Sequence, residues 1–136
     1  MINFKNILYP IDLDSENISS IKTALEFAQL FNCRVHILYV NDIEAGYRHP
    51  TDREDAVALR VKKLVDESLL KDLDIIYAVS KGETAEEIVK YAHDNHIDLI
   101  IIGHKNRGTL YAALFDSTDI NTIDKASLPV LVIPEK

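Results

Sequence analysis

The hydrophobic positions of the chain fall into five short runs, each about the length of a β-strand. The runs are rich in branched residues, and three of them are nearly continuous rather than alternating. They are Ile7–Ile11, Val35–Val40, Ile75–Val79, Leu99–Ile102 and Val130–Ile133. Continuous apolar runs are typical of strands that are buried on both faces, as in a parallel sheet covered by helices.

Segments with helical periodicity lie between these predicted strands. Three of them have apolar stripes over Ile18–Ala28, Val57–Val65 and Ile88–Ala92. A fourth helix is expected over Ser117–Ala126, and a shorter helical turn over Leu110–Leu114. Asp14 or Ser15 is expected to cap the first helix. Thr84-Ala85-Glu86-Glu87 matches a capping box, in which the Thr84 hydroxyl caps the helix and Glu87 returns to the Thr84 amide.

Strands and helices therefore alternate along the chain, which predicts a single α/β domain over residues 1–136 with a doubly wound parallel sheet and helices on both faces. No linker, repeat or low-complexity segment interrupts this pattern. The longest irregular segment is Asp42–Arg53, and loops of that length are often functional or mobile.

Charge and composition exclude several classes of protein. Lys and Arg number 15 against 22 Asp and Glu, so the net charge is −7. This balance argues against a general nucleic-acid binder and against docking on an anionic membrane. Cys33 has no second cysteine to pair with, and no apolar run approaches the roughly 20 residues of a membrane span. We therefore expect a cytoplasmic protein.

Ligands of open parallel sheets bind beyond the carboxyl ends of the strands, where the winding reverses. The loops to inspect follow the first, second and fourth predicted strands. Neither G-x-x-x-x-G-K-[ST] nor G-x-G-x-x-G occurs, so the sequence lacks the main support for a P-loop or a Rossmann dinucleotide site.

Three segments resemble the universal stress protein family. Asn6–Asp12 is similar to that family's opening strand, Gly103-His104-Lys105 to the end of its fourth strand, and Leu128–Pro134 to its fifth. The resemblance covers essentially the whole chain in order and spacing. It implies a five-stranded parallel sheet in the order 3-2-1-4-5 and a homodimer formed through the last strand, here Leu128 to Ile133.

Nucleotide-binding members of this family carry G-x2-G-x9-G-[ST] after the fourth strand. The spacing is kept here, but Asn106 and Asp116 stand where the second and third glycines would be, while Gly103 and Ser117 match. Asn106 tolerates the left-handed backbone that a glycine would adopt. The resemblance is therefore to the subgroup with a degenerate ATP-binding motif.

Asp116 decides how the phosphate half of this motif is interpreted. A carboxylate at this position would repel a triphosphate, and it can cap the following helix in place of an anion. Lys105 and Arg107 are candidates to offset that charge, although exposed loop cations are common. Ser117 is a candidate for phosphate contact or phosphorylation, or it simply leads the helix.

The adenosine half of the motif is better preserved. By resemblance, Pro10, Asp12 and the backbone near Val40 would hold adenine and ribose, whereas the alternative for Asp12 is a turn residue that ends a strand. The candidate ligands are accordingly adenosine, AMP and ATP.

No metal site and no catalytic residue is predicted. His93 and His96 lie three residues apart but have no third ligand near them in the sequence, and His104 has no nucleophile that it obviously serves. Cys33 is expected to be buried and inert, and Tyr9, Tyr39 and Tyr77 are expected in the core.

We therefore expect a non-enzymatic cytoplasmic stress-response protein that acts as a dimeric binding or regulatory module toward an unknown protein partner, with weak or absent ATP binding. An adenine-nucleotide sensor or slow ATPase of the same family is the alternative. An electron-transfer flavoprotein relative would share the fold only.

Overall fold

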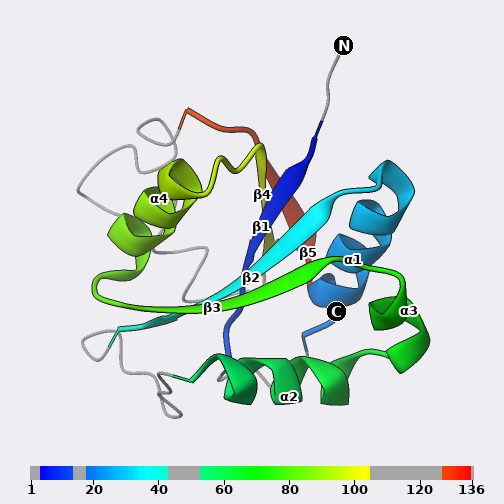
Figure 1. Ribbon diagram of the computed structural model, residues 1–136. Helices are drawn as coiled ribbons and strands as arrows, with labels where there is room; N and C mark the ends of the chain where they lie inside the picture. Colours follow the sequence, from blue (N-terminus) through cyan, green and yellow to red (C-terminus); the bar gives the residue numbers. More distant parts are fainter. Residues whose placement is uncertain (1–3, 14–17, 43–52, 105–126, 136) are drawn as a thin grey trace.

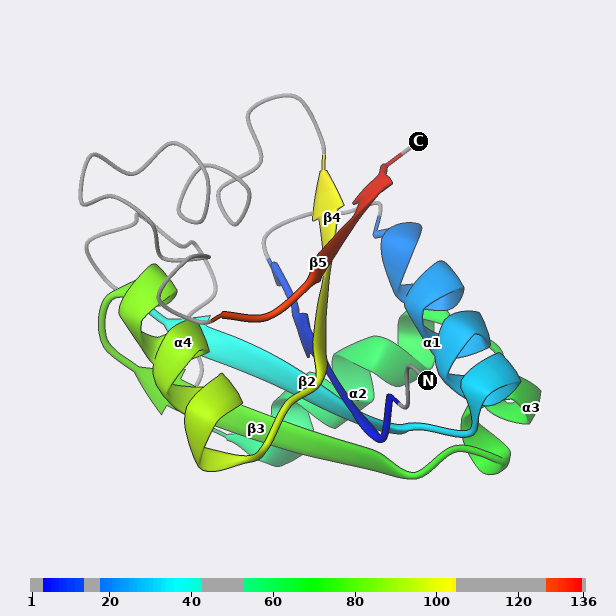
Figure 2. The ribbon, with the colours of Figure 1, turned by 90° about the horizontal axis from the view of Figure 1, so that it is seen from above.

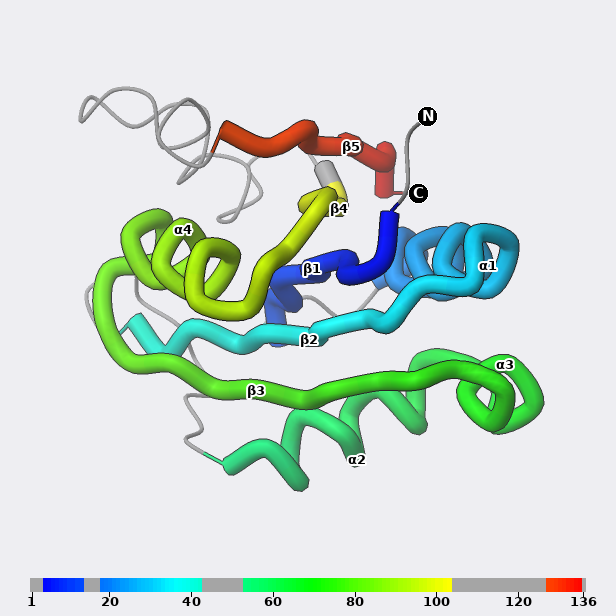
Figure 3. Tube along the Cα trace, turned by 45° about the horizontal axis from the view of Figure 1, so that its top comes forward, coloured from blue at the N-terminus to red at the C-terminus, as the bar shows by residue number. Residues whose placement is uncertain are grey.

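The computed structural model describes residues 4–13, 18–42, 53–104 and 127–135 (Figure 1). Its strands are β1 (Asn6–Pro10), β2 (Arg34–Asn41), β3 (Ile75–Lys81), β4 (Leu99–His104) and β5 (Val130–Pro134). Its helices are α1 (Ser20–Phe31), α2 (Glu54–Leu64), α3 (Glu67–Lys71) and α4 (Thr84–Asp94). The strands form one parallel sheet in the order β3-β2-β1-β4-β5 (Figure 3), which confirms the predicted doubly wound fold.

Helices cover both faces of the sheet (Figure 2). Alternate residues of β1, β2 and β4, beginning at Ile7, Val35 and Leu99, pack against α1 and α2 in one apolar cluster. The intervening residues, such as Leu8 and Leu38, pack against α4 in a second cluster. Both faces of the central strands are therefore buried, which is why their sequences are continuously apolar.

Strand β1 lies in the middle of the sheet. Ile7 pairs with Val35 of β2 on one side and with Leu99 of β4 on the other. Because the three strands are parallel, their carboxyl ends lie at the same edge of the sheet, where the loops after β1, β2 and β4 begin.

Helix α1 begins later than the sequence suggested. Neither Asp14 nor Ser15 is its cap, because the helix starts at Ser20 and Ser19 occupies the cap position without a side-chain cap bond to the helix. The carboxylate of Glu135 binds the first amides of the helix instead. The helix ends at Asn32, whose left-handed backbone (φ of 55°) lets its N–H reach back to the carbonyls of the last turn.

The start of α4 also corrects a prediction. Glu83, not Thr84, is the cap, and its carboxylate accepts hydrogen bonds from the amides of Ala85 (3.1 Å) and Glu86 (2.7 Å). The Thr84 hydroxyl donates to Asp42 at 3.0 Å, so it is not the acceptor that a capping box requires.

The predicted helix over Val57–Val65 is α2, but the chain extends at Val65 and resumes as the short helix α3, which the sequence analysis missed. The helix predicted at Ser117–Ala126, the turn at Leu110–Leu114 and most of the loop Asp42–Arg53 lie outside the described residues. Among the residues that the structure describes, no helix has the length and apolar character needed to cross a membrane.

Of the residues expected in the core, Tyr9, Tyr39 and Cys33 are buried and Tyr77 is only partly buried. Tyr77 packs against the α1–α2 cluster from the edge strand β3. Cys33 is buried just before β2, where its thiol donates to the Phe4 carbonyl at 2.7 Å. Burial raises the pKa of the Cys33 thiol, which favours the protonated form over the reactive thiolate.

Candidate functional site

Four of the predicted site residues lie at the carboxyl edge of three neighbouring strands. Pro10 ends β1 and Asp12 follows two residues later, Val40 is near the end of β2, and Gly103 is in β4. Because β1 is flanked by β2 and β4, these residues lie at the point where the winding of the sheet reverses, which is where open parallel sheets bind ligands. The structure thus groups the three residues that the resemblance assigns to the adenosine half of a nucleotide site, Pro10, Asp12 and Val40, with Gly103, the first residue of the phosphate motif.

Two of these residues form an apolar wall. Pro10 is buried and lies, by strand alternation, on the same face as Leu8, and Val40 packs in the same cluster as Leu8. Asp12, two residues after Pro10 in the chain, is half-buried. An apolar wall with an adjoining carboxylate suits a flat heterocycle attached to a group that carries hydroxyls.

The residues predicted for the phosphate half, Lys105, Asn106, Asp116 and Ser117, lie outside the described residues. Their contribution to the site therefore remains a prediction from the sequence.

The same edge of the sheet holds a polar cluster that the sequence analysis did not find. Glu135 follows β5 and accepts hydrogen bonds from the Ser19 amide (2.7 Å), the Ser19 hydroxyl (2.9 Å) and the Ser20 amide (3.0 Å). The Ser20 hydroxyl also donates to Glu135. More than a hundred residues separate the partners along the chain, so no local motif announced this contact.

Tyr9 extends the cluster into the core. Its hydroxyl lies 2.6 Å from the Ser20 hydroxyl, and its ring is buried. Burial raises the pKa of Tyr9 well above its ordinary value; the hydrogen bond with Ser20 opposes this rise, and the nearby carboxylates of Glu135 and Asp12 add to it. Tyr9 is therefore a neutral phenol, and it donates to Ser20 because the Ser20 hydroxyl donates to Glu135.

Asp42 is a second functional-looking carboxylate that the sequence analysis placed only in a loop. It is buried after β2 and accepts from both the amide (2.9 Å) and the hydroxyl (3.0 Å) of Thr84. Asp42 is therefore buried for a structural reason, because its carboxylate accepts hydrogen bonds from polar groups of Thr84 that would otherwise lack a partner at the start of α4.

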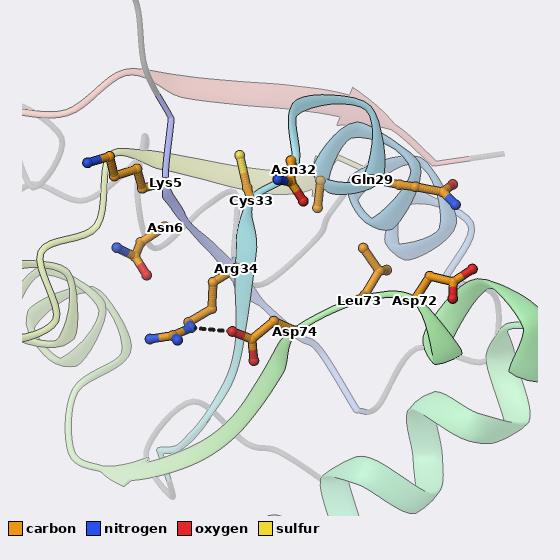
Figure 4. Close-up of a pocket in the computed structure, with 10 residues that line it drawn as sticks. Lys5, Asn6, Gln29, Asn32, Cys33, Arg34, Asp72, Leu73 and Asp74 are labelled. Atoms are coloured by element: carbon orange, nitrogen blue, oxygen red, sulfur yellow. Dashed lines mark hydrogen bonds and ion pairs between the residues drawn. The ribbon is translucent and has the colours of Figure 1, made fainter.

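A cavity of about 390 Å³ lies at the opposite, amino-terminal edge of the sheet (Figure 4). It is lined by polar residues at the start of β1, the end of α1 and the turn before β3, and Arg34 pairs across it with Asp74 at 2.7 Å. Both side chains of that pair are at least half exposed, so the pair stabilises the fold little. Of the predicted site residues that the structure describes, none lines this cavity.

No group of three or more His, Cys, Asp or Glu side chains among the described residues is arranged to hold a metal ion. His93 lies in the last turn of α4, where a cation would complement the helix dipole.

A comparison with protein-family models decides the family. The model of the universal stress protein family matches residues 3–134. The chain belongs to the universal stress protein family. The resemblance drawn from the motifs is thereby confirmed at the level of the family, while the degenerate-motif subgroup stays a prediction.

Individual members of the family are similar over nearly the whole chain. The universal stress protein MJ0531 of Methanocaldococcus jannaschii is 29% identical over 142 residues, which cover 96% of this chain and 82% of that relative. A universal stress protein solved in complex with cAMP superposes with a TM-score of 0.67 at 14% identity, covering 99% of this chain and 100% of the other. One from Archaeoglobus fulgidus in complex with dAMP has a TM-score of 0.57 at 20% identity, with 99% and 100% coverage. At these identities the two structures establish the shared fold.

Proposed function

We propose that this universal stress protein is a non-enzymatic, cytoplasmic stress-response protein that acts as a dimeric binding or regulatory module toward a partner protein. In this proposal its crevice takes adenosine or AMP and binds ATP weakly or not at all. The observation that carries the proposal is the grouping of Pro10, Asp12, Val40 and Gly103 at one edge of the sheet.

The adenosine half of the ligand fits the described residues. The apolar wall of Pro10 and Val40 suits adenine, and the Asp12 carboxylate can accept hydrogen bonds from ribose hydroxyls. Two relatives of the same fold were solved with cAMP and with dAMP, which supports an adenine-containing ligand for this chain.

The triphosphate half is opposed by charge. Asp116 takes the place of a glycine in the family's motif, and Asp119 follows it closely. Two carboxylates near a triphosphate raise its energy, because like charges repel. We therefore expect affinity to fall, not rise, as phosphates are added.

Equilibrium dialysis with adenosine, AMP and ATP tests this proposal. We expect AMP or adenosine to bind more tightly than ATP, and Asp116→Gly to raise ATP affinity about tenfold, which corresponds to about 1.4 kcal/mol. Asp72→Gly is the matched control, because it removes the same charge from an exposed position at the other edge of the sheet. Tighter binding of ATP than of AMP by the unmodified protein would refute the charge argument.

A nucleotide sensor or slow ATPase is the second candidate, favoured by the same cAMP and dAMP complexes of its relatives. Chromatography of the denatured protein would reveal a nucleotide that co-purifies with it. Steady release of inorganic phosphate from ATP, abolished by Asp12→Ala, would replace the first proposal by this one.

The dimer of the proposal uses β5. Among the described strands β5 pairs only with β4, and its Leu131 and Val132 side chains are 37% and 36% exposed. An edge strand with open backbone groups and partly exposed apolar side chains favours pairing with a second copy.

A further inference from the structure

The start of α1 carries an unusually complete set of hydrogen-bond donors. Two consecutive amides and two hydroxyls, from Ser19 and Ser20, converge on a single carboxylate, that of Glu135. The positive end of the α1 dipole points at the same position, and it favours a negative charge there. Four donors and a dipole are what a phosphate or sulfate group also requires.

Gly103 leaves the room for this anion. A Cβ at position 103 would overlap the Oε1 atom of Glu135 and the Ser20 hydroxyl, so a side chain on β4 and a charged group at the start of α1 exclude each other. Gly103 is also the first residue of the family's phosphate-loop pattern, which brings the bound carboxylate directly beside the start of that loop.

The donors are polarised toward the anion from within the core. Tyr9 donates to the Ser20 hydroxyl, and the Ser20 hydroxyl donates to Glu135. A chain of hydrogen bonds that all run in one direction strengthens the last bond in the chain. The site is at the same time open to an external competitor, because Ser19 is exposed and Glu135 is only half-buried.

We propose that Ser19, Ser20 and the start of α1 form an oxyanion site that Glu135 of the same chain fills, and that Glu135 is the specificity-determining residue that keeps phosphate groups out of this end of the crevice. It follows that the start of α1 should prefer an uncharged part of a nucleoside to a phosphate group. This ligand preference rests on the proposed function. The oxyanion site itself does not.

Inorganic phosphate is the probe for the oxyanion site. Its affinity is measured from the amide resonances of Ser19 and Ser20 at constant ionic strength, since salt screens this interaction. We expect Glu135→Ala to bind phosphate at least about tenfold more tightly than the unmodified protein, because four donors lose their carboxylate and a repelling charge is removed. Glu135→Gln keeps the shape and one acceptor oxygen, so its gain should be smaller, and it carries the test if the alanine variant does not fold.

Glu83→Gln is the matched control. It removes one carboxylate from the start of α4, where Glu83 accepts from two helix amides, and thus changes net charge and helix capping in the same way. We expect it to leave phosphate affinity at Ser19 and Ser20 unchanged. An equal gain in Glu83→Gln, equally tight binding by the unmodified protein, or no gain in either Glu135 variant would overturn the proposal and leave Glu135 as a structural cap.

The ratio of AMP to adenosine affinity is measured on the same variants. We expect Glu135→Ala to raise this ratio. If no variant binds either compound while Glu135→Ala still gains phosphate, the proposed function fails and the oxyanion site stands. If adenosine and AMP bind but the ratio of their affinities is unchanged in Glu135→Ala, the role of Glu135 in specificity fails and the proposed function stands.

Discussion

Among the residues that the structure describes, His36 is a buried group whose charge state affects stability in weak acid. It lies in β2, 4% exposed, with Nδ1 at 2.8 Å from the Tyr91 hydroxyl and Nε2 at 3.1 Å from Asn6 Oδ1. Since Asn6 Oδ1 can only accept, Nε2 carries the hydrogen and Nδ1 accepts from Tyr91. Burial lowers the pKa of His36 below its usual 6.5, and the Arg34 charge lowers it further, while Asp74 opposes the shift.

This lowered pKa predicts a loss of stability in weak acid. The unfolded chain takes up the His36 proton first, so the stabilising contribution is complete above about pH 6.5 and is lost as the pH falls below that value, by about 1.4 kcal/mol for each unit of difference in pKa. Urea denaturation between pH 7.5 and 5 measures it. His36→Gln should flatten the profile over this range. A profile unchanged in His36→Gln would contradict the assignment.

The sequence predicted site residues at this scale wherever a local motif marked them. Asp12 and Gly103 follow recognisable strands, and both lie at the expected edge of the sheet. Glu135 and Asp42 carry no such mark, because what makes them important is a hydrogen-bond partner that is distant along the chain. Nothing in Pro134-Glu135-Lys136 predicts a contact with Ser19.

At the scale of elements, two helices start on carboxylates supplied by other parts of the fold. Glu135 binds the start of α1, so the cap predicted from the local sequence of that helix was wrong. At α4 the Thr84 hydroxyl donates to Asp42, and the neighbouring Glu83 caps the helix in its place. The strands were predicted within one or two residues because their signal is the apolar run itself. The break between α2 and α3 was missed because the apolar stripe continues through Val65, which is buried even though it is not helical.

Asp42→Ala tests this account of α4. The substitution leaves the buried Thr84 amide and hydroxyl without their acceptor, so we expect the free energy of unfolding to fall by about 2 kcal/mol. Hydrogen exchange at the first amides of α4 should accelerate as well. Asp72→Ala at an exposed position should change the free energy by less than about 0.5 kcal/mol. Equal effects of the two substitutions would show that the Thr84 bonds contribute no stability.

For the whole molecule, the alternation of elements predicted a parallel sheet, and the family resemblance supplied the strand order. Periodicity alone leaves the order open, since it records which residues are buried and not which strands are neighbours.

The strand pairing shows which backbone amides of β5 face β4 and which face outward. The Ile100 amide donates to the Pro129 carbonyl at 3.1 Å. In a parallel pair the amides of Leu131 and Ile133 therefore face β4, and those of Val130 and Val132 face away from it.

Val132→Pro is accordingly a selective test of the proposed dimer. It removes an outward amide, so we expect a folded monomer in sedimentation experiments, with the circular dichroism of the parent protein. Leu131→Pro is the contrasting variant, because it removes an amide that faces β4 and should lower the melting temperature as well. A Val132→Pro protein that still sedimented as a dimer would exclude β5 as the interface.

The central position of β1 has a consequence for synthesis on the ribosome. The first three strands are consecutive neighbours and can pair as residues 6–81 emerge, but the other side of β1 is completed only by β4. At about 5–20 residues per second, Leu99 follows Lys81 by roughly one to four seconds. During that interval the nascent chain presents an unpaired backbone edge beside Ile7 and Leu8, both fully buried in the finished protein. We expect ribosome-bound chains of this length to be held by a chaperone that recognises exposed apolar strands.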